Sequence, residues 1–395
     1  MPIREADNVV GVIGAGAMGS GIAQLAAAAG HPVILRDVSD DVVQRGVDSI
    51  KKSLAGQVAR KKMTEARAEQ ILERVSKDTG GETGALHECA IVIEAIIEQL
   101  DAKRRLFRDL EDEVAPNCIL ATNTSSLSVT AIASVCARPQ RVIGIHFFNP
   151  PTALPLVEIV PGKLTSPEVT NQARLLIDSW GKTTVVASDT PGFIVNRIAR
   201  PFYGEAMRIY EEGIADPATI DWAMREIGGF KMGPFELMDF IGNDVNLAAT
   251  TAVYEGTDKD PRYKPSPTQQ RLVMRGYLGR KSGRGHYEYS EGATKPEPVK
   301  DAALGERIVK RILAMLINEA ADAARLGIGS PTDIDLAMTK GVNYPKGLLT
   351  WGNEIGLDNV AQTISELRAA NGDDDRYRVS PLLTEMISRG ERFYQ

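Results

Sequence analysis

One histidine stands out among the residues that could perform acid–base chemistry. The chain of 395 residues contains four histidines, and His146 opens the stretch HFFNPPTALPLVE, which ends at Glu158. Histidine is the side chain whose ordinary pKa lies close to neutrality, so it can accept a proton from an alcohol at physiological pH. A buried carboxylate at Glu158 would orient the ring and favour the imidazolium formed on proton uptake. The alternative interpretation is a packed strand end that carries a structural histidine.

Polar side chains also follow other apolar segments, at positions where buried parallel strands would end. Residues 90–98, 118–126 and 141–150 each begin with an apolar run and finish in polar residues. Because ligands of open α/β sheets bind beyond the carboxyl ends of the strands, we expect these polar residues to line one site. They are Glu98, Asn123, Ser125, His146 and Asn149.

The N-terminal segment has the pattern of a dinucleotide-binding turn. Residues 8–13 predict a buried strand, the sequence GAGAMG follows, and a helix with a small-residue face comes next. Gly14 would permit the tight turn, Gly16 the approach of backbone to a pyrophosphate, and Gly19 close packing of helix on strand. The N-terminus of that helix favours a phosphate. The alternative is a glycine-rich turn without a ligand.

The second predicted strand ends at Asp37, which bears on the choice of cofactor. Its carboxylate could accept hydrogen bonds from a ribose 2′-hydroxyl and would repel a 2′-phosphate, so the sequence favours NAD over NADP. The neighbouring Arg36 weakens this prediction, because a guanidinium could pair with a phosphate.

Residues 40–78 are predicted to be largely helical, and they concentrate positive charge in an otherwise acidic chain. Two interpretations are about equally good: a solvated helical hairpin, or an arm that meets a polyanionic substrate. The basic residues of this arm are Lys51, Lys52, Arg60, Lys61 and Lys62.

Bulk properties exclude several classes of function. The formal net charge of −6 gives no electrostatic support to a nucleic-acid partner. Three cysteines, Cys89, Cys118 and Cys136, lack the number and spacing of a disulfide framework or a metal site. No apolar run approaches the ~20 residues of a membrane helix, and the charged N-terminus does not resemble a signal peptide. We therefore expect a cytoplasmic protein without a membrane or metal partner.

Taken together, the motifs resemble those of L-3-hydroxyacyl-CoA dehydrogenases. The segments GAGAMGSGIAQ, IEAIIE, TNTSSL, GIHFFNP, LVE and DTPGFIVNR occur in the order of that family, from residue 8 to about 290. The resemblance implies NAD-dependent oxidation of (S)-3-hydroxyacyl-CoA to 3-oxoacyl-CoA, in fatty-acid or aromatic catabolism. It also implies four catalytic residues: Ser125, His146, Glu158 and Asn196.

The roles of these four follow from their chemistry. His146 would take the hydroxyl proton, Glu158 would orient its ring, and Ser125 with Asn196 would hold the substrate oxygens. Besides the three glycines, the resemblance places NAD contacts on Asp37, Glu98, Lys103, Ser125, Asn149 and Lys281. Asn123, at a predicted strand end, is added as a further cofactor contact. It places coenzyme A contacts near Ser53 and Lys61.

A change of sequence pattern near residue 190 and the resemblance together indicate the domain order. A Rossmann-type α/β domain over residues 1–188 would precede two tandem all-helical domains that are like the C-terminal domain of 6-phosphogluconate dehydrogenase. The first helical domain covers 189–289, a polar linker covers 290–304, and the second helical domain covers 305–395. In the first helical domain, the first helix is expected to begin within DTPGFIVNR and to continue through Tyr210.

The second helical domain repeats the first at a constant offset of 114 positions, which indicates a tandem duplication. Ile220-Asp221 recurs as Ile334-Asp335, and Arg262-Tyr263 recurs as Arg376-Tyr377. Asn196 is replaced by Lys310, so the second copy is expected to be structural. It could occupy the place of a partner subunit, giving a pseudo-dimer within one chain, or it could shape the acyl pocket; further homo-oligomerisation stays open.

Other functions remain compatible with parts of this pattern. The stretch LAMTKGVNYPKGLLTWG resembles longer members that act on 3-hydroxyadipyl-CoA. Rival classes are dehydrogenases of the 6-phosphogluconate or 3-hydroxyisobutyrate kind, enzymes of sugar acids or other non-thioester 3-hydroxy acids, and inactive structural relatives.

Overall fold

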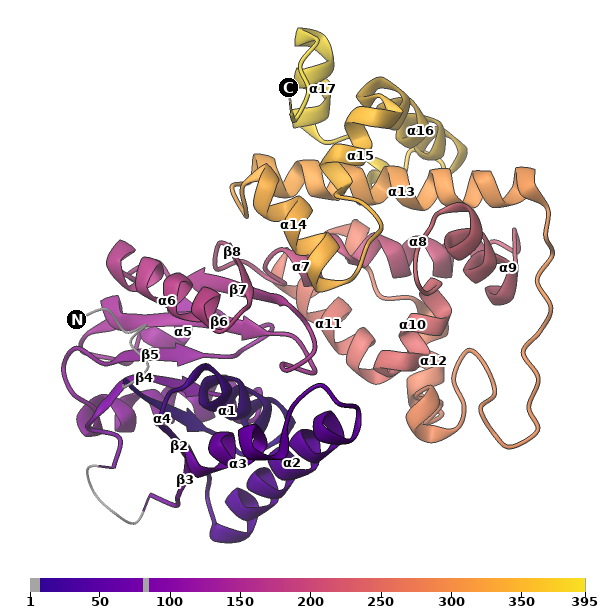
Figure 1. The fold of residues 1–395 in the computed structure, drawn as a ribbon. Coiled ribbons are helices and arrows are strands. Elements are labelled where there is room, and N and C mark those ends of the chain that lie inside the picture. The colour runs from indigo at the N-terminus through magenta and orange to yellow at the C-terminus, as the bar shows by residue number, and fades with distance from the viewer. Residues whose placement is uncertain (1–7, 81–84, 395) are drawn as a thin grey trace. The chain divides into compact units, whose positions relative to one another are not determined.

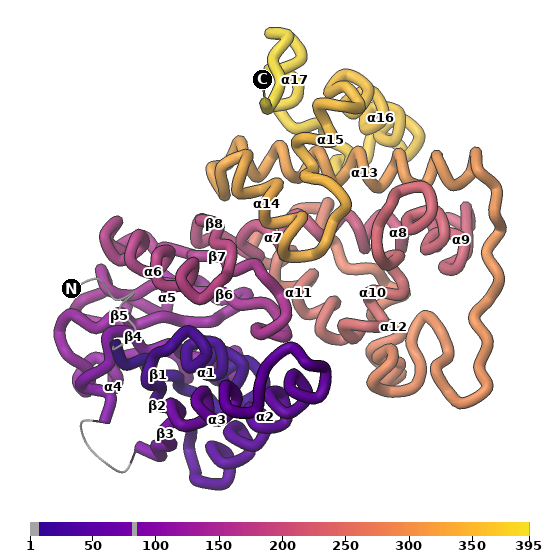
Figure 2. The backbone as a smooth tube through the Cα atoms, viewed as in Figure 1, coloured from indigo at the N-terminus to yellow at the C-terminus, as the bar shows by residue number. Residues whose placement is uncertain are grey.

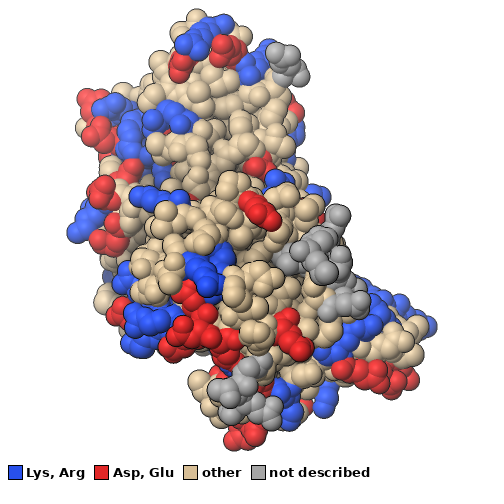
Figure 3. All heavy atoms as spheres, turned by 90° about the vertical axis from the view of Figure 1, so that its left-hand side faces the viewer, with Lys and Arg blue, Asp and Glu red and all other residues tan. Residues whose placement is uncertain are grey.

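The computed structural model describes residues 8–80 and 85–394. The chain forms two compact units, residues 1–189 and 190–395 (Figure 1). Within these described residues, no helix combines the length and the apolar character that crossing a bilayer requires. Figure 3 shows basic and acidic side chains interspersed over one face of the molecule.

The N-terminal unit is built on one eight-stranded sheet with the strand order β3-β2-β1-β4-β5-β6-β7-β8. All neighbouring strands are parallel except the antiparallel pair β6 and β7. The strands are β1 (Val9–Ile13), β2 (Val33–Arg36), β3 (Val75–Asp78), β4 (Cys89–Glu94), β5 (Ile119–Thr122), β6 (Val142–Phe147), β7 (Leu156–Pro161) and β8 (Thr183–Val186). The order reverses between β1 and β4, which is where doubly wound sheets bind their ligands.

Helices cover both faces of this sheet and bury its apolar strands. The helices are α1 (Ala17–Ala29), α2 (Asp40–Ala59), α3 (Glu65–Glu73), α4 (Leu100–Glu113), α5 (Val129–Ala133) and α6 (Pro167–Ser179). One core layer contains side chains of α1, α2, α3 and α6, and the other contains side chains of α4 and α5. The three cysteines are buried free thiols, and burial raises the pKa of Cys136 to about 11.

One segment of the expected helical arm is a strand. Residues 75–78 were expected to be helical but form the edge strand β3, which pairs in parallel with β2. An ion pair between Arg36 and Asp78 joins the two strands at their ends. Because β3 is stabilised by these bonds to a distant strand, its four residues alone do not indicate a strand.

The C-terminal unit is helical (Figures 1 and 2). A first segment contains α7 (Val195–Ile198), α8 (Arg200–Glu211), α9 (Pro217–Trp222), α10 (Pro234–Ile241), α11 (Asn243–Gly256) and α12 (Pro267–Met274). A second segment contains α13 (Ala302–Arg325), α14 (Pro331–Gly341), α15 (Leu348–Ile355), α16 (Leu357–Ala370) and α17 (Pro381–Arg389).

Two helix boundaries differ from the sequence prediction. The helix expected through Tyr210 is interrupted at Ala199, between α7 and α8; Pro201 lacks the amide hydrogen that would continue the ladder. Figure 2 traces an extended segment that leads into α13. This linker, expected over 290–304, ends at Asp301, whose carboxylate caps α13 by accepting from the Leu304 amide at 3.1 Å.

The two helical segments use the same local devices at positions 114 residues apart. Asp221 accepts hydrogen bonds from the first amides of α10, and Asp335 accepts from those of α15. A Cβ on Gly233 or on Gly347 would lie 2.3 Å from the corresponding aspartate, so each aspartate needs a glycine beside it. The same backbone problem is therefore solved twice with the same residue types.

Candidate active site

His146 and Glu158 face each other across the only antiparallel strand pair among the described strands of the sheet. They are direct register partners on β6 and β7, and His146 Nδ1 lies 2.7 Å from Glu158 Oε2. Glu158 is fully buried and His146 is 5% exposed. When Nδ1 donates to the carboxylate, the tautomer carries its lone pair on Nε2, the nitrogen that can accept a proton. The hypothesis of a positioned acid–base pair thus has the required geometry.

The loop between β6 and β7 returns the chain so that this pairing is possible. The carbonyl of Pro150 accepts hydrogen bonds from the amides of Ala153 and Leu154 at 3.0 and 3.1 Å. Lys182 donates to the carbonyls of Pro151 and Leu154 at 2.6 and 2.8 Å. Lys182 could not be singled out from the sequence, because its partners are backbone oxygens 31 and 28 residues away.

Ser125 lies on the loop after β5, and Glu98 organises that loop. Glu98 Oε1 accepts from the Thr124 hydroxyl at 2.6 Å, from the Ser125 amide at 2.9 Å and from the Ser126 amide at 3.2 Å. Burial alone would raise the pKa of Glu98, but the Lys103 ammonium and these hydrogen bonds lower it. The carboxylate therefore stays charged and fixes the loop that carries Ser125.

Lys103 is buried beneath this loop, with a side chain that is 1% exposed. Its ammonium lies 2.5 Å from Glu94 and 3.2 Å from Glu98. Glu94 also accepts from the Thr122 hydroxyl at 2.7 Å. The ammonium of Lys103 is therefore paired with two carboxylates. One of them, Glu94, supports the site although the sequence motifs did not indicate such a role.

The other two strand-end residues differ in their surroundings. Asn123 Oδ1 accepts from the Phe147 amide at 2.8 Å, which ties the end of β5 to the end of β6. Asn149 is exposed, two residues beyond β6.

The glycine-rich turn has the three properties that a dinucleotide needs. Gly14 has a φ of +103°, and a Cβ there would lie 2.5 Å from the Ala95 carbonyl oxygen. A Cβ on Gly19 would lie 1.7 Å from the Gly14 carbonyl oxygen, so helix and strand could not approach as they do. A Cβ on Gly16 would meet nothing within 4 Å, which leaves this backbone open to a ligand. The turn therefore fits a pyrophosphate at the N-terminus of α1.

Two charged residues at the carboxyl end of β2, Arg36 and Asp37, bear on the choice between NAD and NADP. Asp37 accepts from the Ala15 amide at 2.6 Å, which places its carboxylate beside the turn. The Arg36 guanidinium instead bonds Glu113 at 2.6 and 2.7 Å and pairs with Asp78. Because both carboxylates engage Arg36, this guanidinium is not available to a 2′-phosphate at the turn.

The remaining predicted residues lie on other elements. Ser53 is half-buried on α2, and exposed Lys61 follows that helix with a φ of +55°. Asn196 lies on α7 of the C-terminal unit. Lys281, also in that unit, has its ammonium 2.6 Å from Asp244.

Family models match both units. The NAD binding domain of 3-hydroxyacyl-CoA dehydrogenase matches residues 9–190, and the C-terminal domain of 3-hydroxyacyl-CoA dehydrogenase matches residues 192–289 and 308–392. The chain belongs to the 3-hydroxyacyl-CoA dehydrogenase family. The family predicted from the motifs is thereby confirmed, and the N-terminal unit is its NAD-binding domain.

Similar members of the 3-hydroxyacyl-CoA dehydrogenase family differ in length. The 3-hydroxyadipyl-CoA dehydrogenase of Escherichia coli K12 is 37% identical over 96% of this chain and 97% of its own length. A probable 3-hydroxybutyryl-CoA dehydrogenase of Bacillus subtilis is 42% identical over 71% of this chain and 96% of its own. Among solved structures, 3-hydroxybutyryl-CoA dehydrogenase of E. coli K12 superposes with a TM-score of 0.90 at 36% identity, covering 97% of this chain and 99% of that chain.

Proposed function

We propose that this protein oxidises (S)-3-hydroxyacyl-CoA to 3-oxoacyl-CoA with NAD, using His146 as the base. The observation that carries the proposal is the 2.7 Å contact between His146 Nδ1 and Glu158, because a buried carboxylate there orients the ring and stabilises the imidazolium that forms on proton uptake. A structural histidine would not require a buried carboxylate partner on the neighbouring strand.

Each residue of the proposed site has a separate task. His146 removes the hydroxyl proton, and Glu158 holds the ring and stabilises the imidazolium. Ser125 and Asn196 hydrogen-bond the substrate oxygens and fix their direction. Bound NAD would supply the acceptor for the hydride from the carbon that carries the hydroxyl group. In the reverse direction, His146 returns its proton to the oxygen as the carbonyl is reduced.

We propose that the cofactor binds at the carboxyl ends of the strands, on both sides of the point where the strand order reverses between β1 and β4. Gly14, Gly16 and Gly19 would cradle the pyrophosphate, and Asp37 would bind the adenosine ribose. Lys103 would act through its ion pairs with the two carboxylates rather than by direct contact. We assign the remaining contacts to Glu98, Asn123, Ser125, Asn149 and Lys281.

The basic arm is proposed to bind the coenzyme A part of the substrate. The five basic residues of the arm are all exposed, which suits them to contact phosphates in water. Ser53 on α2 and Lys61 at its end are the candidate contacts. The full-length similarity to a 3-hydroxyadipyl-CoA dehydrogenase supports a dicarboxylic acyl group as one substrate, and a cytoplasmic location remains our prediction.

The second helical segment is proposed to take the place of a partner subunit. Arg197 Nε donates to Glu319 at 2.9 Å, and Arg311 Nε donates to Glu205 at 3.0 Å. Arg311 and Glu319 lie 114 positions after Arg197 and Glu205. Reciprocal pairing of this kind is the signature of a two-fold interface, and it supports both the tandem duplication and the pseudo-dimer.

The activity is tested by adding acetoacetyl-CoA and NADH to the purified protein and following NADH absorbance. Consumption of NADH that requires the thioester supports the proposal. Turnover of free acetoacetate or a sugar acid, without turnover of any acyl-CoA, would contradict it. Comparing kcat/KM for four-carbon and six-carbon dicarboxylic 3-oxoacyl-CoA then identifies the preferred acyl group.

A further inference from the structure

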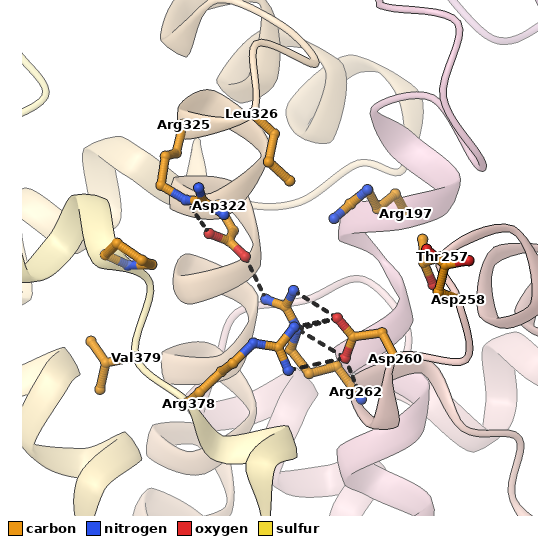
Figure 4. Close-up of a pocket in the computed structure, with 11 residues that line it drawn as sticks. Arg197, Thr257, Asp258, Asp260, Arg262, Asp322, Arg325, Leu326, Arg378 and Val379 are labelled. Atoms are coloured by element: carbon orange, nitrogen blue, oxygen red, sulfur yellow. Dashed lines mark hydrogen bonds and ion pairs between the residues drawn. The ribbon is translucent and has the colours of Figure 1, made fainter.

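The C-terminal unit contains a pocket of about 400 Å³ at the junction of the two helical segments. Arg197 and Arg262 of the first segment line it, together with Arg325 and Arg378 of the second (Figure 4). None of these residues belongs to the proposed catalytic or cofactor-binding set. The pocket therefore raises the question of what its four guanidinium groups could bind.

Arg197 presents unused donors to this pocket. Its Nε bonds Glu319 at 2.9 Å, but neither Nη atom donates to any residue in the described part of the chain. The residue is only 6% exposed, and Figure 4 shows its guanidinium extending toward the middle of the pocket lining. A guanidinium edge whose N–H groups reach the pocket without a partner among the described residues is well suited to bind a carboxylate through two parallel hydrogen bonds.

The chain itself shows how such a carboxylate would sit. Arg311, the counterpart of Arg197, bonds Glu205 through Nε and binds Glu212 with both Nη atoms at 2.6 and 2.9 Å. The position 114 residues after Glu212 is Leu326, which lines the pocket and is 48% exposed. The two Nη atoms of Arg311 thus bind the carboxylate of Glu212, whereas the corresponding Nη atoms of Arg197 face a leucine, Leu326, that offers no acceptor.

Two of the three carboxylates that line the pocket, those of Asp322 and Asp260, are already engaged. Asp322 accepts from Arg262 and from Arg325 Nε, each at 2.8 Å, and Asp260 pairs with Arg262 and Arg378. Within the described residues the Nη atoms of Arg325 have no partner. Asp258 is exposed and lies at the edge of the lining in Figure 4.

Apolar atoms complete the wall. Leu326, Val379 and Pro381 border the same space as the two open guanidinium groups. A purely inorganic anion would leave these atoms against water, whereas a short aliphatic chain would cover them. A pocket lined by both guanidinium groups and apolar side chains favours a small ligand with an anionic end and an apolar body.

We propose that this pocket binds a small organic carboxylate. Its carboxylate lies on the Nη edge of Arg197, in the position that Glu212 takes on Arg311, and Arg325 contributes further donors. Its short apolar body lies against Leu326, Val379 and Pro381. The site is formed by both helical segments, so only a chain that carries both can provide it.

The test is calorimetric titration of the full-length protein with hexanoate, with inorganic phosphate as the comparison anion. Leu326→Glu supplies the carboxylate that Glu212 supplies at the other end, and it should weaken hexanoate binding at least tenfold. The same variant should unfold at a higher temperature than the wild type, because the Nη edge of Arg197 is then filled. Leu326→Gln has a similar size without the charge. It removes the apolar contact of Leu326 but leaves the Nη edge of Arg197 open, so it should weaken hexanoate binding much less than Leu326→Glu does.

Several outcomes would overturn the proposal. One is the absence of hexanoate binding to the wild type at millimolar concentration. Another is equal binding to wild type and Leu326→Glu, which would place hexanoate elsewhere in the molecule. Equal loss in the Glu and Gln variants would show that bulk, not charge, matters. Binding of phosphate alone would exclude an organic carboxylate.

Discussion

His146 and Glu158 are opposite each other in the register of β6 and β7, and their side chains meet at 2.7 Å. His146→Gln keeps a polar side chain of similar reach but cannot accept the proton. We expect it to bind NADH normally and to lose roughly 10²–10⁴-fold in kcat. Steady-state kinetics and NADH fluorescence titration measure the two effects separately.

Glu158→Gln is the matched variant for this pair. It retains a hydrogen-bonding partner for His146 but removes the charge that stabilises the imidazolium, so kcat should fall while the KM for NADH changes little. Near-wild-type turnover in His146→Gln would refute the base assignment, whatever the effect of Glu158→Gln.

Asp37 should determine the preference for NAD over NADP. Asp37→Ala removes the ribose acceptor and the charge that repels a 2′-phosphate, so the ratio of kcat/KM for NADH to that for NADPH should fall at least tenfold. Arg36→Gln is the control, because Arg36 is bonded to Glu113 and Asp78. A large change of this ratio in Arg36→Gln would contradict the arrangement.

Lys61 should act on the coenzyme A part of the substrate alone. Lys61→Ala is expected to raise the KM for acetoacetyl-CoA severalfold with kcat nearly unchanged, and the effect should shrink at high salt because screening weakens exposed charges. Lys77→Ala, on β3, is the matched control. An equal effect of the two substitutions would indicate general electrostatics rather than a specific contact.

The reciprocal arginine–glutamate pairs should contribute similarly to stability. Glu319 and Glu205 are each 1% exposed. Among the described residues, Glu319→Leu leaves Arg197 without a carboxylate and Glu205→Leu leaves Arg208 without one, while Arg311 keeps its bonds to Glu212. A buried arginine that loses its partner typically costs roughly 3–5 kcal/mol in unfolding free energy. Denaturant titration of Glu319→Leu and Glu205→Leu should give comparable losses, and a loss in only one of them would argue against equivalent roles.

His286 should make stability depend on pH. Burial lowers the pKa of His286 to about 4, although Asp239 acts in the opposite direction. In the unfolded chain this histidine binds a proton near pH 6.5, whereas in the folded protein it stays neutral down to about pH 4. The folding stability that goes with a neutral His286 is therefore complete above pH 6.5 and is lost as the pH falls from about 6.5 through about 4. The unfolding midpoint of His286→Gln should fall less over this range than that of the wild type. His87→Gln, at an exposed position, should follow the wild type.

Much of the N-terminal unit could be predicted because its signals are local. The glycine turn, the apolar strands and the polar strand ends all lie within short stretches of sequence.

The supporting residues could not be predicted from such stretches. Lys182 looks like an ordinary surface lysine in the sequence, and Lys103 was singled out only through the family resemblance, because the partners of both are brought to them by the fold. The edge strand β3 depends in the same way on β2. The open guanidinium of Arg197 became visible only by comparison with the filled one of Arg311.

Because α8 and α13 belong to one chain, their contact survives any dilution that would separate two subunits. Each residue at this contact also has its own codon, so a change at Leu326 leaves Glu212 untouched. In a symmetric homodimer the same change would occur twice. One end of the junction is thus free to acquire a ligand while the other end keeps the original bond.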